Sequence, residues 1–135
     1  MTKPIKYMLD TNIVSHFIKN SGRVCEKIIS LPMSELSISA ITKGEMYFGL
    51  AKKPESTQLK KLIHEFLIRI DVLPWDGVAA ECYGNLRADL QKTGRVLGNL
   101  DLLIAAHALA LNLTLITNDR AFFQVTDLHV EDWTT

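Results

Sequence analysis

Four acidic residues stand out because each lies at the end of a strand-like segment or at the start of a helical one. Asp10 and Asp119 follow short apolar runs, whereas Glu45 and Asp101 lie near the start of helical patterns. Carboxylates that converge in a crevice repel one another unless cations neutralise them. Oxygen ligands without His or Cys suit Mg²⁺ or Mn²⁺, which bind carboxylates, water and phosphate oxygens. Together the four acids indicate hydrolysis of a phosphodiester at a divalent-metal site.

Each acid also has a purely structural interpretation. Thr42 and Glu45 fit the capping-box pattern, in which each side chain bonds to the other residue's backbone amide. Asp101 near a helix start is stabilised by the helix dipole, and Asp10 and Asp119 are common types of turn residue. Singly, each acid is explained by local structure, so only their convergence favours a shared site.

The elements that must position these acids alternate between strands and helices. Apolar runs rich in β-formers predict short strands at 5–9, 36–39, 71–74, 113–117 and around Val130. Helical spacing of apolar residues predicts helices over 13–18, 22–31, 42–53, 59–70, 76–90 and 100–111. The expected helix caps are Thr11 or Asn12, Thr42, Asp76 and Asn99.

This alternation predicts one α/β domain spanning residues 1–135, with a mainly parallel central sheet and helices on both faces. The almost wholly apolar segment 113–117 is typical of a strand covered on both faces. Ligands of open parallel sheets bind outside the carboxyl ends of the strands. We therefore expect the four acids, though distant in sequence, to meet at that edge.

Composition limits the possible functions. Of the 135 residues, 15 are Lys or Arg and 15 are Asp or Glu, so the formal net charge is zero. The 47% hydrophobic content is typical of a folded domain, which argues against disorder. A globally basic nucleic-acid clamp is excluded, so any contact with nucleic acid must use a local patch.

The chain is expected to be cytoplasmic. Asp10 comes too early for the apolar core of a signal peptide, and no apolar run approaches the roughly 18 residues that span a bilayer. Cys25 and Cys82 lie far apart in apolar segments, so they are expected to be buried free thiols rather than zinc ligands or a disulfide.

Ordered motifs carry a resemblance across nearly the whole chain. They are LDTN at 9–12, EMYFG at 45–49, GNLDLLIAAHA at 98–108, LITND at 115–119 and VEDW at 130–133. In this order they resemble the PIN-domain family and, within it, the VapC toxins of type II toxin–antitoxin systems. The set is much more specific than any of its pieces.

The resemblance implies a PIN-like fold and a Mg²⁺- or Mn²⁺-dependent endoribonuclease. Its catalytic and metal-binding acids would be Asp10, Glu45, Asp101 and Asp119, supported by Asn12 and Thr117. Water would attack the phosphodiester, leaving 5′-phosphate and 3′-hydroxyl ends. Asp119 matches the least constant position of the family, and Gly98-Asn99 stands where the family often has Gly-Pro.

The resemblance also implies a substrate and partners. The substrate would be RNA, with tRNA, including initiator tRNA, as the expected class. A small VapB-type antitoxin would block the site and bind operator DNA, so this chain would meet DNA only through that complex. A homodimer is implied too, and the apolar helical segments at 22–31 and 42–67 are candidate interfaces.

Basic side chains must offset the repulsion between RNA phosphates and an acidic site. The candidates lie on segments that lead into the acidic corners: Lys43, Arg87, Lys92, Arg95 and Arg120. Arg87 and Lys92 also fit a simple solvated helix face.

Two alternatives remain open from the sequence. A haloacid-dehalogenase-like phosphohydrolase also uses an early Asp and Mg²⁺, but Asn12 stands where that family has a second Asp. A phospho-aspartate at Asp10 would support it. The other alternative is a non-catalytic PIN-like binding module, although degenerate members of that kind usually lose acids that this chain keeps.

Overall fold

The central sheet is parallel throughout the residues that this computed structural model describes, 4–19 and 22–135. Its strand order is β3-β2-β1-β4-β5. The strands are β1 (Tyr7–Leu9), β2 (Leu36–Ser39), β3 (Asp71–Leu73), β4 (Thr114–Ile116) and β5 (Val130–Glu131). The chain adds β2 and β3 on one side of β1 and then crosses to add β4 and β5 on the other. The order therefore reverses between β1 and β4, where α/β sheets open a ligand crevice.

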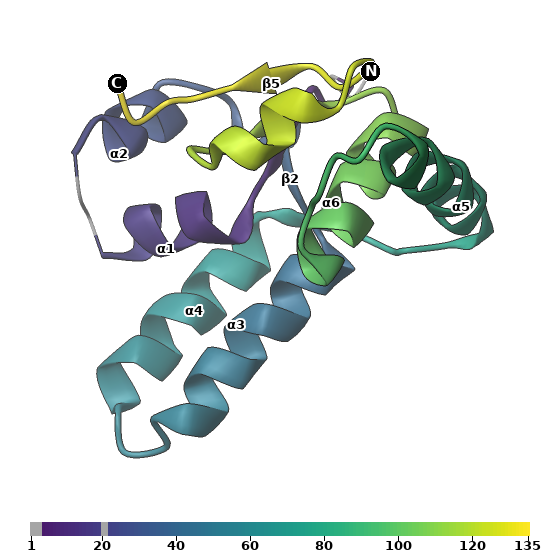
Figure 1. Cartoon of the computed structure of the whole chain (residues 1–135). Helices are drawn as coiled ribbons and strands as arrows, with labels where there is room; N and C mark the ends of the chain where they lie inside the picture. The colour runs from purple at the N-terminus through teal and green to yellow at the C-terminus, as the bar shows by residue number, and fades with distance from the viewer. Residues whose placement is uncertain (1–3, 20–21) are drawn as a thin grey trace.

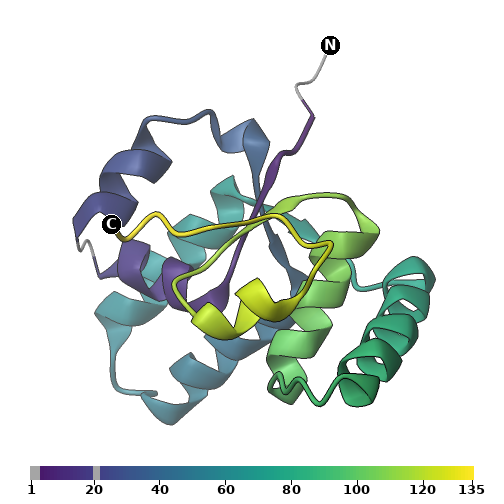
Figure 2. The same ribbon diagram turned by 45° about the horizontal axis from the view of Figure 1, so that its top comes forward.

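Helices cover both faces of this sheet (Figures 1 and 2). They are α1 (Thr11–Ile18), α2 (Gly22–Ile29), α3 (Ala40–Lys52), α4 (Thr57–Arg69), α5 (Gly77–Lys92) and α6 (Asn99–Ala110), with 3₁₀ turns η1 (Met33–Glu35) and η2 (Arg120–Gln124). Met8 and Leu115 pack in the core under α5, α6 and η2. Their neighbours Leu9 and Ile116 pack with α1 to α4 on the other face. Successive side chains of a strand point to opposite faces, so one short strand serves both cores.

The predicted architecture is confirmed, and most predicted elements are present. The strand predicted at 36–39 has the same bounds in the structure, while the first strand is shorter than predicted and begins at Tyr7. The helix predicted from residue 42 begins at Ala40, and the helix predicted at 100–111 spans Asn99–Ala110. Differences of one or two residues are normal at helix ends, where hydrogen bonding frays.

The predicted caps of α1 and α6 are wrong. Asp10 caps α1, because its extended backbone precedes the helix and its Oδ1 accepts a 2.8 Å hydrogen bond from the Thr11 N–H. Asn12 therefore lies inside the helix. Gly98 precedes α6 without a side-chain cap, so Asn99 is the first helical residue rather than the cap.

The capping box predicted at Thr42 and Glu45 is also wrong. Ser39 caps α3, with its hydroxyl accepting a 3.1 Å hydrogen bond from the Ile41 N–H. Thr42 is thus already helical, and Glu45 takes no part in capping α3. The cap predicted at Asp76 is confirmed by a 3.1 Å hydrogen bond from the Ala79 N–H, at the start of α5.

Both cysteines are free thiols, as predicted, although only Cys25 is buried and Cys82 is half-buried. Among the described residues, no helix is both long and apolar enough to cross a bilayer. Residues 1–3 of the N-terminal segment, on which the expectation of no signal peptide partly depends, lie outside the described residues.

Candidate active site

Asp10 forms the buried centre of the candidate site. It follows the central strand β1, and only 3% of its surface is exposed. One carboxylate oxygen accepts from the Thr11 N–H, and the other accepts a 2.8 Å hydrogen bond from the Thr117 hydroxyl. Burial raises the pKa of Asp10 above its usual range despite these bonds, and the charges of Asp119 and Glu45 raise it further.

Thr117 joins two of the acids through one hydroxyl. Its Oγ1 donates to Asp10 and accepts a 3.1 Å hydrogen bond from the Asp119 N–H. Asp119 in turn caps η2, accepting from the Ala121 N–H at 2.9 Å. Thr117 is fully buried just after β4, so this connection lies between the ends of the two strands at which the sheet order reverses.

Glu45 approaches from α3 and is half-buried. The Thr11 hydroxyl lies 3.2 Å from the Thr42 hydroxyl and 3.5 Å from Glu45 Oε1, so it spans α1 and α3. Burial raises the pKa of Glu45, and the charge of Asp101 adds to the effect. Thr11 and Thr42 were predicted only as helix caps. The position of Thr11 directly after Asp10 was the only sequence signal that its hydroxyl could also contact an acid of the site.

Asp101 lies in the first turn of α6. A Cβ added at Gly98 would meet Asp101 Oδ2 at 3.4 Å, so the backbone before the helix approaches this carboxylate closely. Burial, followed by the charges of Asp10 and Asp119, raises the pKa of Asp101 to about 6. The Asp101 carboxylate therefore lies within range of the charges of Asp10 and Asp119, which come from two other segments of the chain.

The predicted convergence of the four acids is therefore present in the structure. The donor set consists of carboxylate and hydroxyl oxygens. Burial and then mutual repulsion raise the pKa values of Asp10, Glu45 and Asp101, and a cation would relieve that repulsion. Among residues 4–19 and 22–135, no group of three or more His, Cys, Asp or Glu side chains is placed so that it could hold a metal ion by itself. The residues fit Mg²⁺ or Mn²⁺, because Mg²⁺ takes only one or two protein carboxylates and keeps several waters.

His107 ties together the two helices that carry Glu45 and Asp101. It is buried in α6, and its Nδ1 lies 2.8 Å from the hydroxyl of Ser39, which caps α3. His107 therefore serves helix packing. It holds the start of α3 against the last turn of α6.

The predicted supporting and RNA-contacting residues occupy varied environments. Asn12 is exposed on α1, and Lys92 and Arg120 are exposed on α5 and η2. The Lys43 ammonium lies 5.9 Å from the ring centre of Tyr47 on its own helix. The Asn12, Lys92 and Arg120 side chains are therefore accessible to a ligand.

The arginines on the α5 side are already hydrogen-bonded within the chain. Arg87 is exposed and donates a 3.0 Å hydrogen bond to the Tyr83 hydroxyl. Arg95 is half-buried and donates to the Gln124 carbonyl and, at 3.2 Å, to the Thr126 hydroxyl. Arg95 therefore connects two loops of the protein, a role that sequence reasoning missed.

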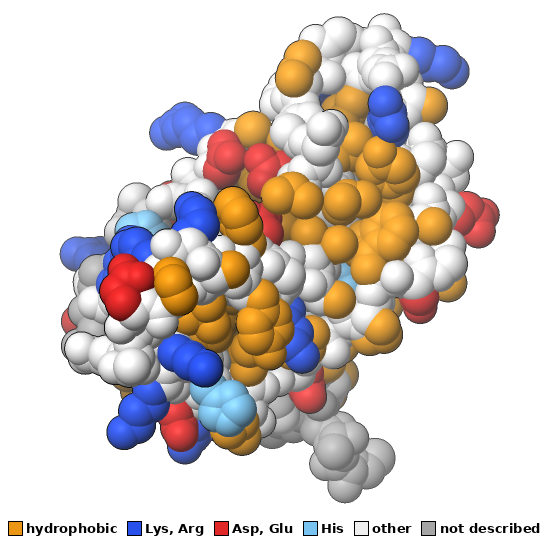
Figure 3. Space-filling model, turned by 90° about the horizontal axis from the view of Figure 1, so that it is seen from below, with side chains coloured by type: hydrophobic (Ala, Val, Ile, Leu, Met, Phe, Trp, Pro, Cys, Tyr) orange, Lys and Arg blue, Asp and Glu red, His pale blue; other side chains and the backbone are white. Residues whose placement is uncertain are grey.

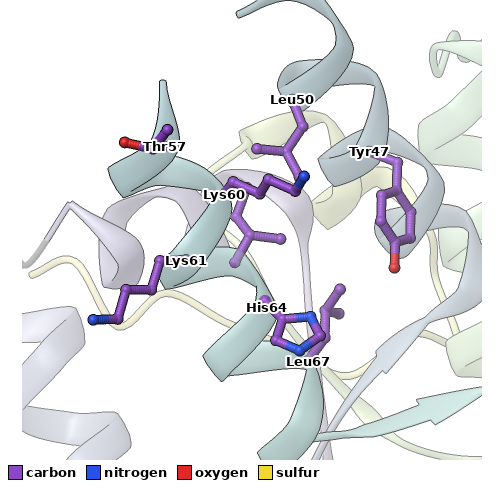
Figure 4. A pocket seen from close by; sticks show the side chains of 8 residues that line it. Tyr47, Leu50, Thr57, Lys60, Lys61, His64 and Leu67 are labelled. Atoms are coloured by element: carbon purple, nitrogen blue, oxygen red, sulfur yellow. The ribbon is translucent and has the colours of Figure 1, made fainter. Parts of the chain in front are cut away.

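A second hollow lies apart from the acids, between α3 and α4 (Figure 4). It has a volume of about 380 Å³ and is lined mainly by apolar and basic side chains, among them Tyr47, Leu50, Lys60, His64 and Leu67. Because no carboxylate lines it, this hollow lacks the chemistry of the first site. Its apolar walls are suited to binding rather than hydrolysis.

Comparison with known proteins agrees with the geometry. The PIN domain family model matches residues 7–128. The chain is 38% identical to the tRNA(fMet)-specific endonuclease VapC of Shigella flexneri, with 96% of this chain and 98% of that protein covered. It is 39% identical to ribonuclease VapC1 of Haemophilus influenzae strain R2866, with 95% and 98% covered.

Solved structures show the same likeness. DNA-bound VapBC from Salmonella typhimurium matches with a TM-score of 0.88 and 33% identity, covering 96% of this chain and 98% of that one. VapBC-1 from nontypeable Haemophilus influenzae matches with a TM-score of 0.84 and 37% identity, covering 97% and 100%. The fold, the converging acids and these relatives together establish that the chain belongs to the PIN-domain family and, within it, to the VapC ribonuclease toxins of toxin–antitoxin systems.

Proposed function

We propose that this chain is a Mg²⁺- or Mn²⁺-dependent endoribonuclease that hydrolyses RNA phosphodiester bonds. The observation that supports it best is the meeting of four acids from four segments at the reversal of strand order, where burial and the neighbouring carboxylates raise the pKa values of Asp10, Glu45 and Asp101. Such an arrangement costs stability unless a cation occupies it. A role limited to helix capping would not require the acids to face one another.

Asp10, Asp101 and Glu45 would hold the metal directly or through water, and Asp119 would complete the set. A bound divalent ion supplies an activated water and stabilises charge on the phosphoryl group. The Thr117 hydroxyl keeps the Asp10 carboxylate oriented, and the Thr11 hydroxyl does the same for Glu45. Attack by water leaves 5′-phosphate and 3′-hydroxyl ends.

We propose tRNA, including initiator tRNA, as the substrate class. The relatives from Shigella flexneri and Salmonella typhimurium are both named tRNA(fMet)-specific endonucleases. Lys43, Arg87, Lys92 and Arg120 would offset the repulsion between phosphates and the acids. Lys43 shares α3 with Glu45, Arg87 and Lys92 lie on α5, which packs against the helix that carries Asp101, and Arg120 directly follows Asp119.

We propose that a small VapB-type antitoxin inhibits the enzyme in the cytoplasm and links the complex to operator DNA. The structural relatives include VapBC complexes, some of them bound to DNA. A groove of about 290 Å³ runs between α1, α3 and α4 from Thr11 and Glu45 to the apolar Leu59 and Ile63. An antitoxin segment with an apolar face would fill this groove and block access to Glu45.

Exposed apolar side chains support a further contact between two copies of the chain. Figure 3, which views the molecule from the side of the α3–α4 hairpin, shows hydrophobic side chains gathered in broad patches. Tyr47 and Phe48 of α3 are 51% and 63% exposed. Large apolar patches mark interaction surfaces, so we propose a homodimer.

Cleavage of total tRNA by the antitoxin-free protein tests the enzymatic proposal. Wild type is expected to give discrete fragments with Mg²⁺ or Mn²⁺ and none with EDTA. Asp10→Asn and Asp101→Asn are expected to lose more than the roughly 100-fold that removal of an outer-shell metal partner can cost. Asn is chosen because it preserves side-chain size and hydrogen bonding at the buried Asp10.

Glu81→Gln is the matched control, because Glu81 is an exposed acid on α5. It should cleave like wild type. Should wild type and variants be equally inert, with no Mn²⁺ binding by calorimetry, the acids serve only as caps and turns and the chain is a binding module. Sequencing of the fragment ends identifies the substrate and checks for the 5′-phosphate.

A further inference from the structure

Arg95 lies where α5 ends and the chain turns toward Asp101. Its backbone is fixed by the helix end: the Arg95 N–H donates to the Leu90 carbonyl at 3.0 Å, and Gly94 has a φ of +68°. This left-handed glycine followed by a bond back to the last turn is a Schellman ending. The Arg95 side chain therefore starts from a well-defined point.

The Arg95 guanidinium then connects this loop to η2. Its Nε donates to the Thr93 hydroxyl at 2.7 Å, while its Nη1 donates to the Gln124 carbonyl and the Thr126 hydroxyl. These acceptors are all neutral oxygens. The guanidinium is thus used as a rigid fork that joins two segments, the geometry in which Arg and Lys are not interchangeable.

Gln124 returns the connection in the opposite direction. Its side-chain Nε2 donates to the Val96 carbonyl and to the Ala121 carbonyl, both at 3.0 Å. Arg95 and Gln124 therefore form a reciprocal pair, here called the Arg95–Gln124 clamp. The Arg95 side chain binds the Gln124 carbonyl, and the Gln124 side chain binds the Val96 carbonyl in the loop of Arg95.

Each segment joined by the clamp carries one acid of the candidate site. The loop that begins at Arg95 ends at Gly98, whose carbonyl accepts the first helical bond of α6 from the Leu102 N–H at 2.8 Å. Asp101 lies within that turn. On the other side, η2 is capped by Asp119 and ends at Gln124. The charge of Asp119 acts on the Asp101 carboxylate, so the two acids lie near each other and their separation matters to any cation between them.

We propose that the Arg95–Gln124 clamp is a positioning device that sets the spacing of Asp101 and Asp119 for the divalent cation. This inference rests on the proposed metal-dependent function and reassigns Arg95 from RNA contact to positioning. A phosphate-binding arginine needs only its charge near the rim. A clamp instead requires this fork and the neutral amide of Gln124, which has no charge to offer RNA.

Calorimetric titration of Mn²⁺ into the RNA-free, antitoxin-free protein tests the clamp. Arg95→Ala, Arg95→Lys and Gln124→Ala are expected to weaken Mn²⁺ binding roughly tenfold, as loss of supporting contacts around a metal does. Lys keeps the charge but not the fork, so its failure to rescue separates positioning from electrostatics. Arg69→Ala is the matched control, because Arg69 makes comparable bonds to Glu65 on α4, a helix that carries none of the four acids.

Hydrogen exchange of the metal-free variants gives a second readout. The Leu102 and Ala121 amides, which report on the turns around Asp101 and Asp119, should exchange faster in the clamp variants than in Arg69→Ala. Mn²⁺ affinity within twofold of wild type in both Gln124→Ala and Arg95→Lys would overturn the clamp while leaving the nuclease proposal standing. Absence of Mn²⁺ binding by wild type would overturn both.

Discussion

The site formed by Asp10, Glu45, Asp101 and Asp119, here called the acidic corner, differs in chemistry from the surface of the α3–α4 hairpin. The corner buries Asp10 and partly buries Glu45 and Asp101, whose pKa values are raised by burial and mutual repulsion. The hairpin exposes Tyr47 and Phe48 to water beside an apolar hollow. Under the proposed function, a cation would relieve the repulsion among the acids, and apolar contact with another protein would cover the exposed hairpin side chains.

This difference shows how one small domain separates chemistry from recognition. Charges are placed where four chain segments meet, and the Thr117 and Thr11 hydroxyls donate hydrogen bonds to two of them, Asp10 and Glu45. The α3–α4 hairpin projects from the rest of the domain (Figure 1), and the Tyr47 and Phe48 side chains of α3 are exposed. Substitutions in the two regions should therefore fail in different ways.

Apart from substitutions of the acids themselves, the largest effect is expected from removing the hydroxyl that joins two of them. Thr117→Val keeps the side-chain shape but leaves Asp10 Oδ2 and the Asp119 N–H without their bonds. We expect tRNA cleavage to fall about 10- to 100-fold and the free energy of unfolding to fall by about 1–3 kcal/mol. Thr114→Val on the same strand is the control. Equal activity of the two variants would show that the hydroxyl does not orient the acids.

A smaller effect with the opposite sign is expected at Asp101. Its pKa is raised to about 6 in the fold, so the stability it contributes is complete below its usual pKa and is lost as pH rises through about 6. Metal-free wild type should therefore lose stability between about pH 4 and 7. Asp101→Asn, which mimics the protonated acid, should lose less, by about 1 kcal/mol after allowance for solvent exposure.

Thermal unfolding across this pH range, with and without Mn²⁺, measures the effect of Asp101. Mn²⁺ at about 100 times its dissociation constant should stabilise wild type by ~2.7 kcal/mol at pH 7 and stabilise Asp101→Asn much less. If the stability of both proteins depends on pH in the same way, the pKa of Asp101 is not raised in the fold.

The smallest effect on the isolated chain is expected on the hairpin. Tyr47→Ser removes an exposed aromatic ring, so the free energy of unfolding should change by no more than about 0.5 kcal/mol, and tRNA cleavage should be unchanged. Binding to the antitoxin or to a second copy should weaken, as measured by calorimetry and light scattering. Ile63→Ala, at a buried hairpin position, should instead cost about 2–5 kcal/mol of stability. If Tyr47→Ser binds the antitoxin and a second copy as wild type does, the hollow between α3 and α4 is not part of the proposed interface.

The sequence alone determined the order of strands and helices and the identity of the four acids. Strand 36–39 and the cap at Asp76 could be predicted because they depend on local spacing and on a side chain that bonds to its own turn. The ordered motifs around Asp10 and Asp101 supported the family, since neither position depends on distant packing to be recognised.

The remaining features depend on which segments meet in space. Local rules favoured Thr42 as a cap, yet Ser39 caps α3. The Ser39 hydroxyl accepts from the Ile41 N–H and also contacts His107 of α6, which lies far away in the sequence. Arg95 resembled a surface charge until the fold brought Gln124 against it. Such contacts join residues far apart in the chain, so only the tertiary structure decides them, whereas the residue types that perform chemistry are already fixed by the sequence.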